Sequence, residues 1–223
     1  MKSLFKLAAI AAVTLMAVSA QAAVVHTSDF IADATRTGFN GFEGIPNNGT
    51  FFTGGAGPYA EGGVTVRQVN GDAGNDIWVA YRPAGGEGAF GWYPDGGDLG
   101  YTEITRTGGG SFVDVGMLIS SGFGNNPNVV TAYELWNNGI LVDSGSLANS
   151  DDFHYLGFSG GGFDTILLSD GFGSFGVRDG HFNAFTVDAI EMAGGNRVPE
   201  PSSLALAALG LAAAGSRLRR QRG

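Results

Sequence analysis

The chain has 223 residues, a formal net charge of −9 at pH 7 and no cysteine. The lack of cysteine excludes a disulfide framework and a thiolate metal site, and only three histidines are available for a zinc or iron centre. The excess of carboxylates disfavours nucleic acid and anionic lipid as partners of the bulk of the surface, and it leaves calcium as the metal whose oxygen ligands are abundant.

The first 22 residues have the organisation of a secretory signal peptide. Lys2 and Lys6 supply a positive start, and an apolar run extends from Leu7 to Val18. Ala20 and Ala22 then form the small-x-small pattern that signal peptidase accepts, so we expect cleavage after Ala22 and export of the remainder. A buried N-terminal helix is the alternative, but the run carries no polar residues at helical spacing.

Residues 23–196 have the length of one domain, and short β-rich runs recur there between turn clusters. The predicted strands are Val24–Ile31, Thr37–Glu43, Val64–Asn70, Ile77–Tyr81, Phe112–Ser120, Val129–Trp136, Ile140–Asp143, Phe153–Phe158, Phe163–Ser169 and Phe182–Met192. The Asn138-Gly139 pair predicts a hairpin, and residues 44–63 are expected to form an irregular loop. No segment keeps a helical period for three turns, so we predict an all-β antiparallel β-sandwich or jelly roll.

The loop from Phe90 to Asp98 is the strongest sequence candidate for a ligand-binding site. Trp92 and Tyr93 supply rings that can stack on a pyranose, and Asp95 and Asp98 supply carboxylates that accept hydrogen bonds from hydroxyl groups. The alternative is that one of these aromatic residues plugs the end of the sandwich core, because large aromatics are usually buried.

Other candidate motifs carry less information. Residues 71–79 come close to a calcium-binding nonapeptide, but a single copy cannot share calcium between stacked turns, so we interpret the stretch as a turn. Residues 171–176 fit the dinucleotide-binding pattern G-x-G-x-x-G, but no helix is expected after them whose N-terminus could hold a phosphate, so this interpretation is disfavoured. For nucleophilic catalysis the chain offers no cysteine and only three histidines. Two carboxylates could still perform glycoside hydrolysis without any local motif, so a hydrolase remains an alternative to a non-enzymatic protein.

The C-terminal 26 residues have three parts. Val198, Pro199, Glu200 and Pro201 form an extended Pro-Glu-Pro stretch, because proline prevents a helix from continuing through it. An uncharged run follows as far as Ser216, which as a helix would reach about 24 Å, short of the roughly 30 Å hydrocarbon core. The basic side chains after it should stay on the cytoplasmic side of the membrane. They are Arg217, Arg219, Arg220 and Arg222.

This tail resembles the PEP-CTERM sorting signal. The resemblance implies recognition by an exosortase, a membrane enzyme of Gram-negative bacteria that also make exopolysaccharide. It also implies a transient inner-membrane anchor, a short transmembrane helix in residues 197–223, and later delivery to the outer surface or extracellular matrix.

A weaker resemblance concerns the segment between the two signals. Gly41-Phe42-Glu43, Phe163 to Leu168 and Phe185 to Ile190 are similar to parts of the jelly-roll carbohydrate-binding modules. In such modules a carboxylate near the first strand and an aspartate in the last strand share a structural calcium, which implies Glu43 and Asp188 here. The alternative is that Asp188 caps a turn or faces solvent on an alternating strand.

Together these patterns predict an exported cell-envelope or extracellular-matrix protein that associates with exopolysaccharide without catalysis. Its expected partners are signal peptidase and the exosortase, with exopolysaccharide as a further candidate. We expect contact with the membrane through the tail before processing and no binding of nucleic acid. A secreted polysaccharide-active hydrolase and a purely structural surface protein are the alternatives.

Overall fold

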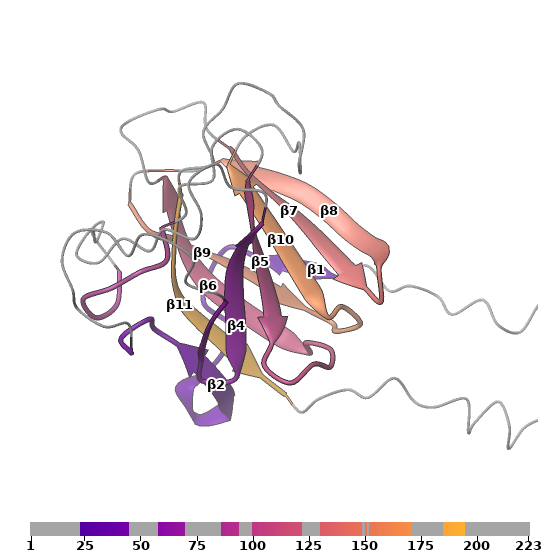
Figure 1. Cartoon of the computed structure of the whole chain (residues 1–223), viewed down its shortest axis with the longest axis horizontal. Coiled ribbons are helices and arrows are strands. Elements are labelled where there is room, and N and C mark those ends of the chain that lie inside the picture. Colours follow the sequence, from indigo (N-terminus) through magenta and orange to yellow (C-terminus); the bar gives the residue numbers. More distant parts are fainter. Residues whose placement is uncertain are drawn as a thin grey trace, which may run out of the picture.

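A computed structural model describes residues 23–44, 58–69, 86–93, 100–121, 130–148, 150, 152–170 and 185–194. These residues form eleven strands and one short 3-10 helix, η1 (Asp33–Thr35) (Figure 1). The strands are β1 (Val24–His26), β2 (Arg36–Asn40), β3 (Tyr59–Glu61), β4 (Val64–Val69), β5 (Tyr101–Arg106), β6 (Asp114–Ser121), β7 (Val130–Asn137), β8 (Ile140–Ala148), β9 (His154–Ser159), β10 (Thr165–Asp170) and β11 (Phe185–Ala193).

The strands pair into two antiparallel sheets. The five-stranded sheet has the order β1-β9-β6-β11-β2, and the six-stranded sheet has the order β3-β4-β5-β10-β7-β8. Each strand pairs antiparallel with its neighbours. Figure 1 shows β4, β5, β10, β7 and β8 side by side in one layer. The predicted all-β antiparallel sandwich is therefore confirmed.

Alternation of apolar and polar residues places one side of each central strand in a shared core. Val64 and Val66 of β4 and Ile166 of β10 are fully buried, and Met117 and Leu156 face them from the other sheet as members of the same cluster. Each such side chain stabilises the fold by about 1.5–3 kcal/mol through removal of apolar surface from water. The residues between them point to the outer faces of the sheets.

The predicted hairpin is confirmed. β7 and β8 pair antiparallel, and the turn between them is Asn138-Gly139. Asn138 has φ 50° and Gly139 has φ 76°, the two positive angles that a two-residue type I′ hairpin turn requires. A bulge between Leu135 and Trp136 shifts the register just before the turn.

Three differences from the predicted strands have physical causes. β5 was not predicted, because its Tyr-Thr-Glu-Ile-Thr-Arg sequence alternates correctly but carries little apolar surface. β3 lies within the stretch expected to be an irregular loop, so that expectation is wrong at Tyr59–Glu61, where a three-residue edge strand pairs with β4. β1 ends at His26 and does not continue to Ile31, because the chain leaves the sheet there. The predicted strand Ile77–Tyr81 lies outside the described residues.

The segment between β1 and β2 crosses the outer face of the five-stranded sheet. These two strands occupy opposite edges of that sheet, so the residues that join them must pass over it. Phe30 in this segment stands edge-on to Tyr155 of β9, with ring centroids 6.1 Å apart. A Cβ on Gly157 would lie 2.6 Å from the Phe30 ring. One outer face of the sandwich is therefore covered by the chain's own N-terminal segment.

Candidate functional site

Trp92 and Tyr93 lie inside the protein. Trp92 is 0% exposed and Tyr93 is 6% exposed. The Trp92 backbone exchanges two 2.8 Å hydrogen bonds with Val187 of β11, and its indole Nε1–H donates to Thr102 Oγ1 at 3.1 Å. The sugar-stacking role predicted for these two rings does not fit their positions, because neither ring presents a face to solvent. Asp95 and Asp98 lie outside the described residues.

Glu43 and Asp188, the two residues implied as calcium ligands, hold the same stretch of backbone. Glu43 Oε1 accepts the N–H of Ala89 at 2.6 Å, and Asp188 Oδ2 accepts the N–H of Glu87 at 2.8 Å. A Cβ on Gly88 would lie 1.9 Å from Glu43 Oε1, so only glycine fits between these two contacts. The two carboxylates are therefore neighbours, and both secure the segment that leads into Trp92.

Burial dominates the electrostatics of Asp188. Loss of hydration raises the pKa of Asp188 to about 6, and the nearby charges of Glu87 and Glu43 act in the same direction against the two backbone hydrogen bonds. In the described parts of the chain, no group of three or more His, Asp or Glu side chains is placed to hold a metal ion. Calcium binding at Glu43 and Asp188 stays a prediction.

The outer face of the six-stranded sheet carries a row of polar and aromatic side chains. The register places Arg67 of β4 opposite Glu103 of β5, Glu103 opposite Leu167 of β10, and Leu167 opposite Glu134 of β7. Alternation directs these side chains away from the core. We call this surface the open face and define it by Arg67, Tyr101, Glu103, Glu134, Trp136 and Leu167.

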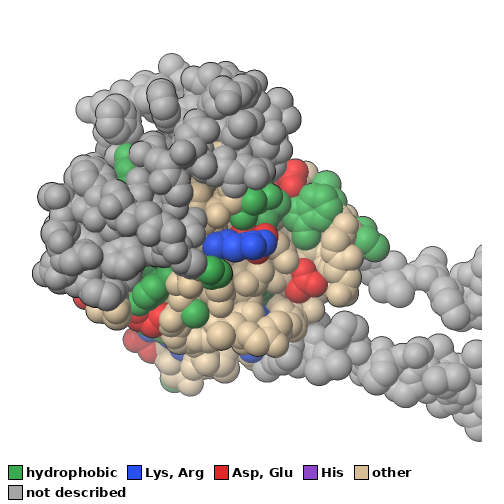
Figure 2. Space-filling view, viewed as in Figure 1, with side chains coloured by type: hydrophobic (Ala, Val, Ile, Leu, Met, Phe, Trp, Pro, Cys, Tyr) green, Lys and Arg blue, Asp and Glu red, His purple; other side chains and the backbone are tan. Residues whose placement is uncertain are grey.

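The side chains of the open face are fixed by one another. Arg67 donates two hydrogen bonds to Glu103, from Nε at 2.7 Å and from Nη2 at 2.9 Å. Trp136 Nε1–H donates to Glu134 Oε2 at 2.8 Å, which holds the indole on the outer side of the sheet. Burial and the charge of Glu103 raise the pKa of Tyr101. Figure 2 shows a basic side chain on this side of the molecule with acidic and hydrophobic side chains around it.

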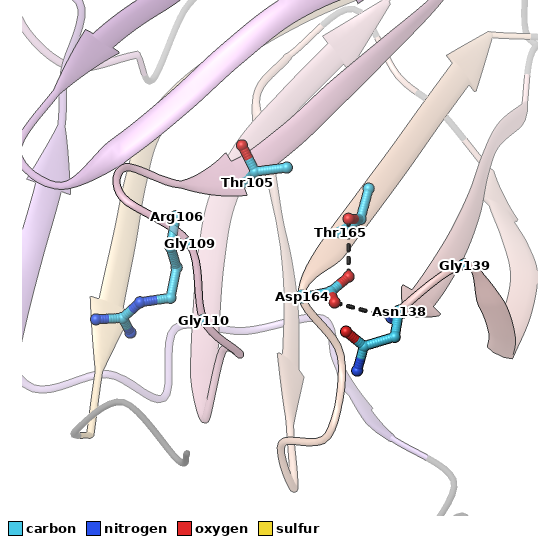
Figure 3. A pocket seen from close by; sticks show the side chains of 8 residues that line it. All are labelled: Thr105, Arg106, Gly109, Gly110, Asn138, Gly139, Asp164 and Thr165. Carbon is cyan, nitrogen blue, oxygen red and sulfur yellow. Dashed lines mark hydrogen bonds between the residues drawn. The ribbon is translucent and has the colours of Figure 1, made fainter. Parts of the chain in front are cut away.

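A polar pocket adjoins the open face where β5, β7 and β10 meet their loops. Its volume is about 500 Å³. The lining residues are Thr105, Arg106, Gly109, Gly110, Asn138, Gly139, Asp164 and Thr165. We call it the end pocket (Figure 3). Asp164 Oδ2 accepts the backbone N–H of Asn138 at 2.8 Å, and Asp164 Oδ1 accepts the Thr165 hydroxyl at 2.9 Å.

Sequence analysis expected an aromatic ring beside carboxylates in the segment from Phe90 to Asp98. The same combination is assembled from the β7–β8 hairpin and β10, where Trp136 pairs with Thr165 and its carbonyl accepts the Asp164 N–H at 2.8 Å. Alternation within the predicted strand was the available signal, since Glu134 and Trp136 are two residues apart and share a face. No local motif joins them to Asp164, because that proximity depends on the pairing of β10 with β7.

The comparisons with known proteins concern mainly the tail. A search of curated proteins gives no significant match. Among solved structures, the enzymatically active domain of tailspike protein 4 from bacteriophage CBA120 is similar at 11% identity with a TM-score of 0.33. The alignment covers 59% of this chain and 19% of the tailspike chain.

The C-terminal signal is identified by a family model. Within the described residues no helix has the length and apolar character needed to cross a membrane, and the C-terminal apolar run lies outside those residues. Residues 197–220 match the model of the PEP-CTERM protein-sorting motif. The chain therefore carries a PEP-CTERM sorting motif, which implies that it is exported and processed at the membrane by an exosortase.

Proposed function

We propose that this chain is a non-enzymatic protein of the cell envelope or extracellular matrix, which binds exopolysaccharide through the open face. The sorting motif supports the destination, because its processing follows export and precedes release to the surface. The observation that carries the binding role is the Trp136 indole, which lies on the outer face of the sheet and is held there by Glu134.

The open face has the chemistry of a glycan platform. An indole offers its ring to the apolar face of a pyranose, and a carboxylate accepts hydrogen bonds from hydroxyl groups. Arg67 and Glu103 form a bidentate pair that remains close to solvent, since the Arg67 side chain is 49% exposed. These groups need little rearrangement to receive a ligand, because their mutual hydrogen bonds already fix their rotamers.

The charge of the protein favours an uncharged polysaccharide. The whole chain carries 21 acidic and 12 basic residues, and half of the basic residues belong to the terminal signals. The one arginine of the open face is already neutralised by Glu103. An anionic polymer would therefore meet the net negative field of the protein at a face whose one arginine is already paired.

A polysaccharide hydrolase is the second candidate. Glu103 and Glu134 lie on one face with a single strand between them, so their backbones are about 10 Å apart. That spacing is near the range for the two carboxyl groups of an inverting glycosidase, about 6.5–9.5 Å. Against catalysis, each of the two carboxylates is bonded to a neighbouring side chain. Turnover of the polymer that Glu134→Gln abolishes while binding persists would favour the hydrolase.

The binding role is tested with the full chain and the exopolysaccharide of its host. We expect Trp136→Ala to weaken binding about ten-fold and Trp136→Phe to weaken it less, because a ring remains for stacking. Val24→Ala, which removes an exposed hydrophobic side chain from the other sheet, is the matched control. Equal binding by Trp136→Ala and the wild type would contradict the proposal.

The sorting role is tested in the host. Replacement of Val198, Pro199, Glu200 and Pro201 by alanine should leave unprocessed protein in the membrane fraction. Asn196→Ala, just outside the matched residues, should be processed normally. Normal release of the alanine variant of the motif would show that exosortase recognition does not depend on these residues.

A further inference from the structure

We infer that the end pocket is a separate subsite that binds one neutral pyranose at the end or at a branch of the glycan. This inference rests on the proposed function, because it assigns a specificity to the same face of the protein. The open face would hold internal sugars of a chain, and the end pocket would recognise where that chain stops.

Asp164 is the preorganised centre of the end pocket. Its N–H donates to the Trp136 carbonyl at 2.8 Å, and its two carboxylate oxygens accept from the Asn138 N–H and the Thr165 hydroxyl. A carboxylate has about four lone-pair positions, so each oxygen retains capacity for another donor. Two adjacent hydroxyl groups of a sugar ring are the donors that match a carboxylate in this arrangement.

The walls of the end pocket leave space for a small ring. Gly109 and Gly139 have φ angles of 86° and 76°, and a Cβ on either would meet no atom within 4 Å. The glycines therefore serve the turns, and open space lies beside them. A volume of about 500 Å³ is within the roughly 300–1,000 Å³ of sites for small ligands.

The position of the end pocket makes it continuous with the open face. Thr165 lines the pocket and is the register partner of Trp136 across β10 and β7. A sugar stacked on Trp136 would therefore have its neighbour in the end pocket. Beyond that point lie the Asn138-Gly139 turn and the Gly109-Gly110 loop, both of which line the pocket.

Charge selects a neutral sugar. In Figure 3 the Asp164 side chain lies between Thr165 and Asn138, whereas the Arg106 side chain extends away from this group. An acidic sugar whose carboxylate lies against Asp164 would therefore be repelled, because Arg106, which also lines the pocket, extends away from Asp164. A neutral pyranose presents only hydroxyl groups and meets no such penalty.

The test is isothermal titration calorimetry of the full chain, purified in mild detergent. The ligands are the methyl glycosides of glucose, galactose and mannose, glucuronic acid, and the host exopolysaccharide before and after partial fragmentation. We expect one methyl hexoside to bind and glucuronic acid to bind at least ten-fold more weakly. Fragmentation should increase binding at equal sugar mass, because it creates chain ends.

Two variants assign the result to the end pocket. Asp164→Asn and the near-isosteric Thr105→Val should each weaken hexoside binding, by at least ten-fold for Asp164→Asn, and should remove the gain from fragmentation. Asp152→Asn is the matched control for the lost charge. Asp152 is exposed and lies between β8 and β9, at the opposite end of β8 from the Asn138-Gly139 turn. Both pocket variants should unfold at temperatures close to that of the wild type.

The outcomes separate this inference from the proposed function. Loss of polymer binding in Trp136→Ala with hexoside binding retained supports both. Hexoside binding that Asp164→Asn abolishes, in a protein that binds no exopolysaccharide, supports the end pocket and contradicts the platform. Absence of binding by every hexoside, equal binding by Asp164→Asn and the wild type, or equal affinity for glucuronic acid would overturn the inference.

Discussion

The two outer faces of the sandwich differ in how much of each is covered by the rest of the chain. The five-stranded sheet is crossed by the segment between β1 and β2, which covers outward side chains such as Tyr155. The six-stranded sheet keeps an outward row in which Arg67 remains 49% exposed. The same residue types are present on both faces, so position relative to the N-terminal segment decides whether a carboxylate serves stability or is available to a ligand.

Glu191 illustrates the covered face. Its side chain is 6% exposed, and it accepts hydrogen bonds from the Tyr155 hydroxyl at 2.8 Å and from Arg36 Nε at 3.1 Å. Arg36 also bonds Asp33 in η1, which ties the crossing segment to the sheet. Among the described residues, Glu134 on the open face accepts a hydrogen bond from Trp136 alone. On the covered face, Tyr155, Glu191, Arg36 and Asp33 are thus linked in one network of hydrogen bonds. On the open face, Arg67–Glu103 and Trp136–Glu134 are separate pairs.

The largest expected contrast is between two tryptophans. Trp92→Ala should lower the free energy of unfolding by about 3–5 kcal/mol, because a fully buried side chain leaves a cavity. Trp136→Ala should cost less than about 1 kcal/mol and should instead weaken glycan binding. Denaturant unfolding and glycan titration on the same preparations measure both quantities. A larger loss of stability for Trp136→Ala than for Trp92→Ala would contradict the assignment of the two rings.

The matched pair of glutamates gives the next largest effect. Glu191→Ala should lower the free energy of unfolding by about 3 kcal/mol, because Tyr155 and Arg36 lose their buried partner. Glu134→Ala should change it by less than about 0.5 kcal/mol, as expected for a substitution near the surface. Similar losses for the two variants, measured by urea unfolding, would mean that the open face is as closed as the covered one.

Asp188 should make stability depend on pH. The folded protein holds this proton more tightly than the unfolded chain, so the contribution of Asp188 to stability is fully present below about pH 4 and is lost as pH rises through about 6. The change in pKa from 3.8 to about 6 corresponds to at most about 3 kcal/mol. Asp188→Asn should lack this decline, and unfolding of both proteins between pH 4 and 7 measures it. Parallel curves would contradict the raised pKa.

The same region allows a test of the calcium prediction. Calcium bound by Glu43 and Asp188 would stabilise their ionised forms, so it should raise the Tm at pH 7 more than at pH 5. Glu43→Gln should remove that increment. A Tm that is identical in calcium and in chelator at pH 7 would count against a metal at this position.

The smallest expected effect is at the hairpin turn. Gly139→Ala should lower the free energy of unfolding by about 1 kcal/mol, because φ 76° is costly for a residue with a Cβ even though no atom obstructs it. Thermal unfolding measures the loss. Binding of long polysaccharide should persist, since the change lies at the edge of the end pocket. A gain in stability would show that the turn relaxes to another type.

The sequence was most informative where the signal is local. The hairpin at Asn138-Gly139 and the sorting residues around Glu200 follow from turn chemistry and a contiguous motif. β5 was missed because its residues pack mainly through two inward positions, Thr102 and Ile104, which give a weak apolar pattern. Local patterns therefore predicted the class of fold and the tail, and they missed β5 in the middle and β3 at the edge of the six-stranded sheet.

The candidate site depends on pairings that no short pattern encodes. Trp92 and Trp136 look equivalent in the sequence, since both are aromatic residues near glycine-rich turns. Their fates differ because Trp92 pairs with Val187 inside the fold, whereas Trp136 lies on the outward side of β7. Asp164 reaches the same place only through the alignment of β10 with β7. Long-range register therefore decides which residues form the site.

The central claim is that the open face, and not the covered face, meets the glycan. Hydroxyl-radical labelling of side chains, read by mass spectrometry with and without the host exopolysaccharide, compares the two faces in one measurement. We expect the polymer to protect Tyr101 and Trp136 and to leave the labelling of Phe30 and Tyr155 unchanged. Protection of Phe30 and Tyr155 without protection of Trp136 would contradict the account.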